Sequence, residues 1–247
     1  LSTGVLQHPV ARRWALLGAL GVVVYPLAFY AGMNLVGVAV GNVVALGSGP
    51  VFAALLEWLF ERERLSGRWL VSTALAVTGI VLLALGREEG GAAVSPGSAV
   101  LGVAVALLAG LAYALYTYAS SRAIRVGQPS RGVMGGMFGL GALPLLVVLA
   151  VLGGPLLASW ASVGLTAYLV VGPMFLAYVL FGIGLRSVRS STATTVTLLE
   201  PVFATVLAVL VVGERLSPVG WVGFALVLVG LAVLVTARRT AARPARS

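Results

Sequence analysis

The stretch PVFAALLEWLFERERLS at residues 50–66 occurs a second time, at residues 201–217, as PVFATVLAVLVVGERLS. Both copies begin with Pro-Val-Phe-Ala and end with Glu-Arg-Leu-Ser, and an offset of 151 residues relates them without a gap. The same offset pairs Gly79 with Gly230, so the register continues beyond the two copies. A register kept over this length indicates an internal duplication. We therefore expect two related halves.

The composition indicates a membrane protein. Of the 247 residues, 60% are hydrophobic and 9% are charged, and the mean hydropathy is +1.08. A soluble domain has roughly a quarter of charged residues, so this chain requires lipid around it. The net charge of +9 does not indicate nucleic acid, because the arginines form short clusters between apolar runs. With no cysteine in the chain, disulfides and thiolate metal sites are excluded, and we expect no cofactor.

Eight apolar runs predict an all-α, polytopic transmembrane helical bundle. Most runs have about 20 residues or more, enough to cross a hydrocarbon core of about 30 Å. Helices are expected because backbone amides in lipid must find partners within the segment. The runs lie at residues 14–34, 37–60, 68–86, 97–121, 132–153, 161–185, 190–212 and 218–237.

The arginines predict the orientation. With eight spans, 14 arginines fall in the two terminal regions and in every second loop, whereas the alternate loops hold only Arg87 and Arg215. Positive charge concentrates on the cytoplasmic side of membrane proteins, so both ends of this chain are expected to be cytoplasmic. The helix of the second copy is five spans after that of the first, so it crosses in the opposite direction. Such inverted-topology repeats are typical of secondary transporters, which bind substrate near mid-membrane between the halves.

The duplication also predicts how the single transmembrane domain, 1–247, is divided. Residues 14–86 form a partial first repeat of three helices, and residues 97–237 form a second repeat of five. An external linker at 87–96 joins them, and 238–247 form a cytoplasmic tail. The chain starts with Leu rather than Met, and the equivalent of the second repeat's start lies before Leu1. We therefore expect two missing N-terminal helices, eight present of ten.

Two further features carry a resemblance to a known family. The second copy contains Gly-Glu-Arg-Leu at 213–216, and Trp-x-Gly-x-Ala-Leu-x-Leu-x-Gly follows at 221–230. With the inverted repeat, these motifs resemble the EamA family of the drug/metabolite transporter superfamily. The resemblance implies a multi-pass carrier of the inner membrane, often an exporter of amino acids, metabolites or drugs. Phe60 to Arg62 of the first copy depart from the motif of the second, and the family's first two helices are absent.

Glu200 is the sharpest candidate for a transport residue. It lies about 15 Å from the cytoplasmic end of its run, near mid-membrane. A charged carboxylate there costs roughly 2.5–3.5 kcal/mol, so it needs a cavity, a partner or a proton. A role as proton carrier is one hypothesis. The alternative is a neutral carboxyl hydrogen-bonded to a carbonyl freed by the neighbouring proline.

Pro50 and Pro201 are candidate hinges because they occupy equivalent positions inside their helices. Proline removes one intrahelical hydrogen bond and clashes with the preceding turn, which kinks a helix. Pro26 and Pro173 are expected to act similarly in the preceding helices. The alternative is that prolines are simply tolerated in membrane helices.

Polar and aromatic side chains at mid-depth suit an amphipathic organic substrate. The alternative is that they only form interhelical hydrogen bonds and packing contacts. With Glu200, the candidate substrate-binding residues are Tyr30, Asn34, Asn42, Ser48, Tyr113, Tyr116, Tyr178, Thr194 and Thr197, and Tyr25 belongs to the same layer.

The remaining acidic residues are expected to be structural. Glu57 lies two turns before a cytoplasmic loop, which favours an interfacial charge that snorkels or is paired. Glu61, Glu63 and Arg64 are expected to be solvated. The Glu214-Arg215 pair is expected to cap a helix rather than to pin a gate.

Three classes of function are open to a membrane chain of this kind. We expect a secondary carrier of small organic solutes working by alternating access, with the lipid bilayer as its surroundings, no nucleic-acid partner and proton coupling as a sub-hypothesis. An enzyme is disfavoured, because the chain has no Asp, no Cys and no intramembrane His. The alternative is a non-transporting membrane partner or assembly protein, or an N-terminally truncated transporter fragment.

Overall fold

The computed structural model describes residues 5, 8–62, 66–85, 96–212 and 217–241. Within these ranges the chain is helical, without a strand, and a helix lies at each of the eight predicted runs. The fold is therefore a polytopic helical bundle, as predicted. Five of the helical stretches are long and apolar enough to cross a membrane: Pro9–Val36, Val40–Glu61, Ala99–Arg125, Ser130–Leu152 and Trp160–Gly184.

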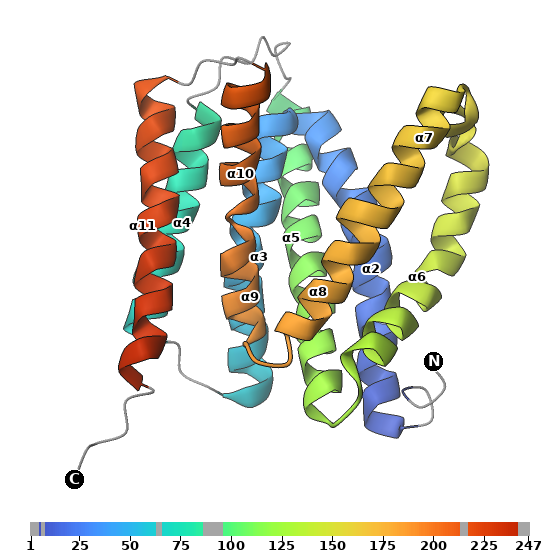
Figure 1. Ribbon diagram of the computed structural model, residues 1–247, viewed down its shortest axis with the longest axis horizontal. Coiled ribbons are helices and arrows are strands. Elements are labelled where there is room, and N and C mark those ends of the chain that lie inside the picture. Colours follow the sequence, from blue (N-terminus) through green and yellow to red (C-terminus); the bar gives the residue numbers. More distant parts are fainter. Residues whose placement is uncertain (1–4, 6–7, 63–65, 86–95, 213–216, 242–247) are drawn as a thin grey trace.

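Six runs form single helices or nearly so, and two are divided into shorter pieces (Figure 1). The undivided helices are α2 (Pro9–Val36), α3 (Val38–Glu61), α4 (Gly67–Leu85), α5 (Pro96–Arg125), α6 (Ser130–Leu152) and α11 (Pro218–Ala241). The sixth run contains α7 (Trp160–Leu169), the π-helix η2 (Val170–Leu176) and α8 (Ala177–Gly184), preceded by the short 3-10 helix η1 (Gly154–Leu157). The seventh contains α9 (Ser190–Thr197), α10 (Glu200–Leu207) and the π-helix η3 (Ala208–Val212).

Some expected boundaries differ from the observed ones. The first helix begins at Pro9 rather than at residue 14, because His8 caps its N-terminus by accepting a hydrogen bond from the Ala11 N–H. The last helix continues to Ala241, so the first residues of the expected tail at 238–247 are helical. The expected linker at 87–96 lies outside the described residues except for Pro96, which begins α5.

A single residue separates α2 from α3. Helix α2 ends at Val36 and α3 begins at Val38, with Gly37 between them at φ +91° and ψ 151°. A side chain is strained at this positive φ, and glycine is not. Gly37 therefore permits the shortest of the helix connections described.

Close helix contacts hold the bundle together. Helix α2 packs against α5, and a Cβ at Gly21 would lie 2.7 Å from the Ala112 carbonyl oxygen. Helix α4 packs against α11, where Gly79 meets the Gly223 carbonyl and Gly230 meets the Ser72 carbonyl. Small residues allow helix backbones to approach in this way.

Residues at equivalent positions of the two repeats form the α4–α11 contact. The offset of 151 residues converts Gly79 into Gly230 and Ser72 into Gly223. The contact between Gly79 and Gly223 therefore corresponds to the contact between Gly230 and Ser72. The Ser72 hydroxyl also donates to the Gly230 carbonyl at 2.6 Å.

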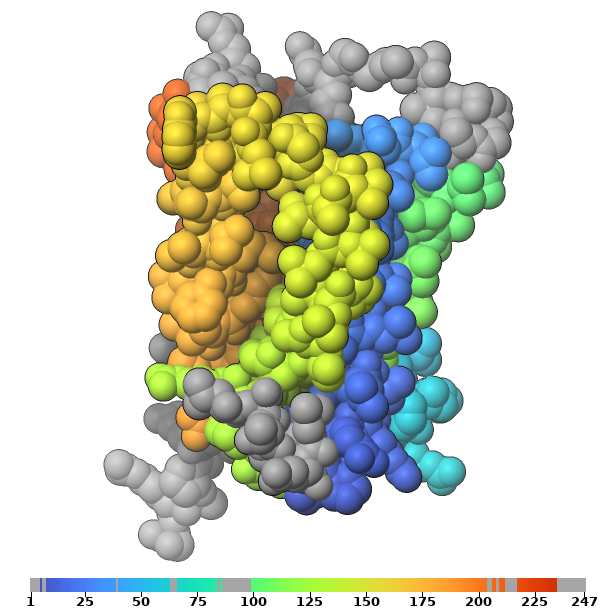
Figure 2. Space-filling model, turned by 90° about the vertical axis from the view of Figure 1, so that its right-hand side faces the viewer, coloured from blue at the N-terminus to red at the C-terminus, as the bar shows by residue number. Residues whose placement is uncertain are grey.

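Helices α6, α7 and α8 form one side of the molecule, and α7 stands away from the remaining bundle (Figure 1). No residue of the most apolar window in Trp160–Gly184 is buried by protein. The space-filling view shows α6 and α7 on this side with a recess between them (Figure 2).

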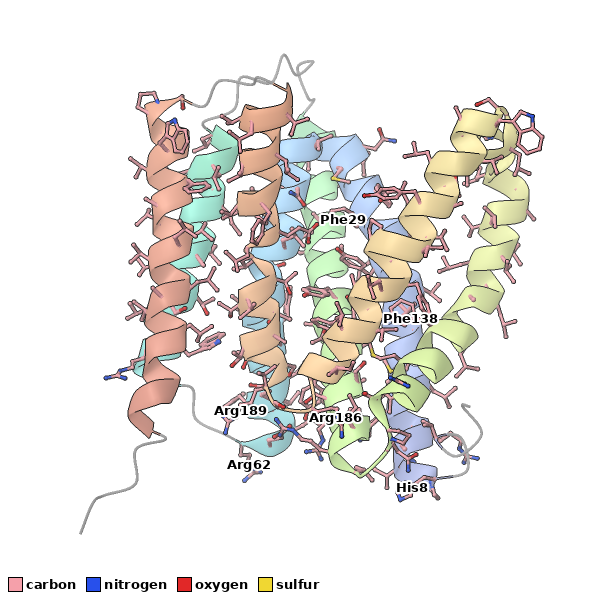
Figure 3. The ribbon with its side chains drawn as sticks, in the orientation of Figure 1. His8, Phe29, Arg62, Phe138, Arg186 and Arg189 are labelled. Atoms are coloured by element: carbon pink, nitrogen blue, oxygen red, sulfur yellow. The ribbon has the colours of Figure 1, made fainter. Side chains whose placement is uncertain are left out.

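The described arginines of several connections gather at one end of the bundle. Arg62, Arg186 and Arg189 lie at this end in Figure 3, as does His8. Arg122 and Arg125 lie there too, because both form ion pairs with Glu61 at the end of α3. We call this the arginine-rich end. The start of α2 and the end of α11 are found at the same end (Figure 1).

Candidate functional site

An aromatic cluster occupies the middle of the bundle, where α2, α5 and α8 meet. Tyr113 and Tyr116 lie one turn apart on α5, with ring centroids 5.3 Å apart. Tyr25 of α2 contacts both, at 5.6 and 6.1 Å. Tyr178 of α8 lies 6.1 Å from Tyr116. These four tyrosines are called the tyrosine cluster.

Phenylalanines extend the tyrosine cluster. Phe29 of α2 lies 5.4 Å from Tyr25, and Phe138 of α6 lies 4.6 Å from Tyr178. Both are labelled in Figure 3, beside the central helices. Neither was among the candidate residues, because a phenylalanine in an apolar run does not differ from its neighbours in any pattern of the sequence.

Hydroxyl groups connect the cluster across helices. The Tyr113 hydroxyl donates to Thr197 Oγ1 of α9 at 2.7 Å, and Thr197 Oγ1 donates to the Ala193 carbonyl at 3.0 Å. The hydroxyls of Tyr116 and Tyr178 lie 3.2 Å apart and share a hydrogen bond. Aromatic rings with polar tips can bind a ligand that has both apolar and polar parts.

Glu200 is the first residue of α10, close to the cluster. Its carboxylate acts electrostatically on Tyr25, Tyr113 and Tyr178. Glu200 is exposed in part, and the rest of its carboxyl is surrounded by protein.

Gly49 explains how Tyr113 is positioned. A Cβ at Gly49 would lie 2.9 Å from Cδ1 of the Tyr113 ring, so the ring packs directly on the α3 backbone. Gly49 is the equivalent of Glu200 under the 151-residue offset. The two halves therefore differ at this position for a steric reason: one position lies against a ring, and the other carries a carboxylate.

The structure brings together five of the ten candidate binding residues: Tyr113, Tyr116, Tyr178, Thr197 and Glu200. Thr194 lies one turn before Thr197 and is fully buried, and its hydroxyl donates to the Ser190 and Ser191 carbonyls of its own helix. Its observed contacts are thus structural.

Three of the four candidates of the first repeat make no described contact with the tyrosine cluster, and the fourth, Tyr30, reaches it through Phe29. Tyr30 is 68% exposed, and its ring centroid lies 5.4 Å from that of Phe29, which packs on Tyr25. Asn34 is exposed near the end of α2, and Asn42 is partly buried near the start of α3. The Ser48 hydroxyl bonds to the Ala45 carbonyl and lies against Gly110 of α5, so Ser48 packs at a helix interface.

The two candidate hinges differ in their surroundings. Helix α3 continues through Pro50 without interruption. In the second repeat, α9 ends at Thr197 and α10 begins at Glu200, just before Pro201. Between them, the N–H groups of Leu198 and Leu199 donate to the carbonyls three residues earlier, as in a 3-10 helix, instead of four residues earlier as in an α-helix. Of the other prolines, Pro26 lies inside α2, and Pro173 lies in the π-helix η2.

One expectation about the acidic residues was wrong, and one is refined. Glu57 is paired, which was one of the two expected alternatives, and it is buried where it accepts hydrogen bonds from Ser190 and Ser191 of α9. Glu61 is not free in solvent, because it pairs with Arg122 at 3.4 Å and with Arg125 at 3.1 Å. Their partners lie more than 60 residues away along the chain, and no local pattern points to them. Glu63, Arg64, Glu214 and Arg215 lie outside the described residues.

A cavity of about 320 Å³ lies between α8, α9 and α11, and its walls are mostly apolar. Thr197, the partner of Tyr113, lines this cavity and therefore connects it to the tyrosine cluster. The other lining residues are Phe181, Gly184, Leu185, Val188, Thr192, Ala193, Val196 and Leu234.

Apolar helices long enough to span a membrane, packed around a cluster of aromatic and hydroxyl groups, define a polytopic membrane protein. The chain belongs to the EamA-like transporter family, which matches residues 5–85 and 100–236. This confirms the resemblance found in the sequence, and membership of the drug/metabolite transporter superfamily follows. The protein is therefore a membrane transporter.

Individual proteins are similar to this chain over most of its length. It is 34% identical over 243 residues to the uncharacterized transporter YwfM of Bacillus subtilis (strain 168), a match covering 97% of this chain and 80% of the relative. It is 25% identical over 189 residues to an uncharacterized transporter of Clostridium kluyveri, covering 74% of this chain and 59% of that relative. A crystal structure of a protein matches with a TM-score of 0.76 at 24% identity, covering 97% of this chain and 81% of the other. That last similarity shows the fold alone.

Proposed function

We propose that this protein is a secondary carrier that exports small organic solutes, such as amino acids, metabolites or drugs, by alternating access. The observation that supports the substrate class is the tyrosine cluster, with Thr197 and Glu200 beside it. It offers aromatic faces, hydroxyl groups and one carboxylate near the middle of the bundle. Amphipathic solutes match these groups.

Alternating access requires two halves that rock around the site. The matching contacts of Gly79 with Gly223 and of Gly230 with Ser72 support an arrangement in which the halves are inverted relative to each other. The arginine-rich end is assigned to the cytoplasm on the positive-inside rule, with the protein in the inner membrane. Outward transport then runs from the arginine-rich end to the opposite end.

Counterflow in proteoliposomes tests the carrier function. Liposomes loaded with an unlabelled solute accumulate the labelled form only if a carrier exchanges the two. Panels of amino acids, sugars and cationic drugs cover the proposed class. Saturable counterflow of at least one solute is expected, and its absence for all panels would favour the alternative, a non-transporting membrane partner. The uncovered surface of Trp160–Gly184 is the observation that favours this alternative.

Tyr113→Phe tests the site. The variant keeps the ring and removes the hydroxyl that donates to Thr197. In the proposed site this hydroxyl also binds the substrate, so loss of one hydrogen bond of about 0.5–1.5 kcal/mol predicts roughly a two- to tenfold increase in the half-saturating concentration. Tyr168→Phe is the matched control, because Tyr168 lies on α7 with an exposed side chain. Equal effects of both variants would contradict the assignment of the site.

Proton coupling through Glu200 is the finer part of the proposal. A carboxyl group can bind and release a proton during the transport cycle, whereas an amide cannot. Glu200→Gln is therefore expected to abolish the pH dependence of transport and to impair uptake driven by a pH gradient. Transport by this variant that stays unimpaired and still depends on pH would reject the coupling role without rejecting the carrier function.

A further inference from the structure

Two elements distant in sequence meet at the arginine-rich end through a buried carboxylate. Glu57 lies one turn before the end of α3, and Ser190 and Ser191 begin α9. Glu57 is only 4% exposed, and the two serines are 1% and 3% exposed. This contact is therefore closed to its surroundings.

Both oxygens of the Glu57 carboxylate accept hydrogen bonds. The Ser190 hydroxyl donates to Oε1 at 2.7 Å, and the Ser191 hydroxyl donates to Oε2 at 2.6 Å. The Ser191 backbone N–H donates to Oε1 at 3.0 Å. N–H groups at the start of a helix lack partners within the helix, and negative charge is favourable there. The carboxylate thus binds both the side chains and the backbone of the first turn of α9.

The equivalent positions of the other half cannot form this contact. Under the 151-residue offset, Glu57 corresponds to Ala208, and Ser190 and Ser191 correspond to Ala39 and Val40. Neither alanine nor valine has a polar side-chain atom. One end of the bundle therefore has a polar connection between α3 and α9 that its counterpart lacks.

The neighbouring ion pairs connect different elements. Glu61 lies one turn beyond Glu57 on α3, and it binds Arg122 and Arg125 at the end of α5. Helices α3 and α5 also pack extensively against each other. These ion pairs therefore reinforce an existing helix contact, and they do not involve α9.

We propose that Glu57 acts with Ser190 and Ser191 as a latch that holds the arginine-rich end closed. Because the equivalent positions, Ala208, Ala39 and Val40, have no polar side-chain atoms, the latch is not repeated there and biases the carrier toward the state that is closed at the arginine-rich end. Loss of the latch shifts the population toward the state open at that end. The inference rests on the alternating access of the proposed function, but it needs no known substrate for its test.

Because the chain has no cysteine, spin labels attach only to cysteines that are introduced for the measurement. Leu59→Cys and Ser187→Cys place spin labels on exposed positions at the arginine-rich end, on α3 and before α9. Val38→Cys with Leu210→Cys gives a second exposed pair, at the start of α3 and in η3. Pulsed electron paramagnetic resonance on the chain in lipid nanodiscs then reports the distance distribution of each pair.

Glu57→Gln is the principal variant. It keeps the size of the side chain, but it replaces one acceptor oxygen by an NH₂ group and removes the negative charge. A longer distance for the Leu59–Ser187 pair and a shorter one for the Val38–Leu210 pair are expected. The ratio of the two populations is expected to change roughly tenfold, which corresponds to about 1.4 kcal/mol.

Two further variants distinguish loss of the latch from a general destabilisation of the fold. Ser191→Ala removes one hydroxyl donor and leaves the backbone bond, so a smaller shift in the same direction is expected. Glu61→Gln is the matched control on the same helix and is expected to leave the distributions unchanged. Labels at Val71 and Val229 on α4 and α11 report whether a variant remains folded.

Each outcome decides the proposal. Unchanged distributions in Glu57→Gln overturn the latch, as does an equal shift in Glu61→Gln. If Glu57→Gln does not fold, Ser191→Ala decides in the same way. A shifted distribution in a protein without counterflow would support the latch and reject the carrier function. Counterflow by a protein whose distance distributions do not shift in Glu57→Gln would support the carrier function and reject the latch.

Discussion

Single positions at equivalent places in the two halves have acquired different tasks. Gly49 leaves room for the Tyr113 ring, whereas its equivalent Glu200 carries a carboxylate next to the same cluster. Tyr113 then reaches Thr197, so one small residue on α3 determines a contact between α5 and α9. At the residue scale, the two repeats share a register, and the residues that differ between equivalent positions determine which side chains lie beside the tyrosine cluster.

Gly49→Ala tests this dependence. The new methyl group would lie 2.9 Å from the Tyr113 ring, so the ring must move and its bond to Thr197 is lost or lengthened. A loss of about 1–3 kcal/mol in stability is expected from such overpacking, measured as thermal unfolding in detergent.

Gly135→Ala is the control, because a methyl group there meets no atom within 4 Å. It is expected to be neutral or to stabilise by up to about 1 kcal/mol, since alanine favours helix over glycine. Similar unfolding midpoints for the two variants would show that the ring does not depend on Gly49.

The sequence pointed to some residues of the tyrosine cluster and its surroundings and not to others, for physical reasons. Glu200 and Tyr113 stand out because polar groups at mid-membrane are costly and need a reason. Glu57 was expected to be paired or to snorkel, but its partners could not be named, because Ser190 and Ser191 belong to a helix more than 130 residues later. Such partners become visible only once the helices are placed in space.

At the scale of elements, the positions of the helices were predictable and their interruptions were not. Each apolar run became helical because lipid offers the backbone no other partners. The same Pro-Val-Phe-Ala sequence lies inside an unbroken α3 but directly after the gap between α9 and α10. The three residues after the proline are identical in the two copies, so the difference arises from the residues around this motif and from the surrounding helices.

Pro201→Ala tests whether the proline maintains this gap. Alanine restores a backbone N–H that can bond to the Thr197 carbonyl, so α9 and α10 are expected to become more continuous. Slower amide hydrogen exchange over residues 198–203, measured by mass spectrometry, is the expected result. Pro50→Ala is the matched control and is expected to change exchange in α3 much less. If Pro201→Ala leaves exchange unaltered, the neighbouring helices rather than the proline impose the gap.

The α4–α11 contact allows a second prediction at this scale. A Cβ at Gly223 would lie 2.5 Å from the Gly79 carbonyl oxygen and from the Leu83 nitrogen, which are backbone atoms that cannot turn away. Gly223→Ala is therefore expected to separate the helices and to destabilise by about 1–3 kcal/mol or more, measured as thermal unfolding. Gly139→Ala, where no atom lies within 4 Å, is the control. An unfolding midpoint for Gly223→Ala as high as that of the control would exclude tight packing at this site.

At the scale of the whole molecule, the chain is asymmetric from side to side. The surface of α7 and η2 is uncovered, yet lipid tails solvate apolar side chains well, so this exposure does not by itself destabilise the fold. The described arginines also gather at one end, and the positive-inside rule predicts that this end is cytoplasmic.

Single cysteines test the orientation. Trp160→Cys lies at the exposed start of α7, at the opposite end from Arg186, and Ser187→Cys lies at the arginine-rich end. A membrane-impermeant maleimide is expected to label Trp160→Cys in intact cells and Ser187→Cys only after the membrane is opened. The reverse pattern would invert the topology and with it the proposed direction of transport.

The one-residue connection at Gly37 has a mechanical consequence. With no slack between them, α2 and α3 cannot slide along each other and must tilt as one stiff lever. The corresponding connection between α8 and α9 has five residues, 185–189, so these helices can change their mutual angle. The α2–α3 pair is therefore a stiff unit and the α8–α9 pair a jointed one, so we expect the angle between α8 and α9 to vary more than the angle between α2 and α3.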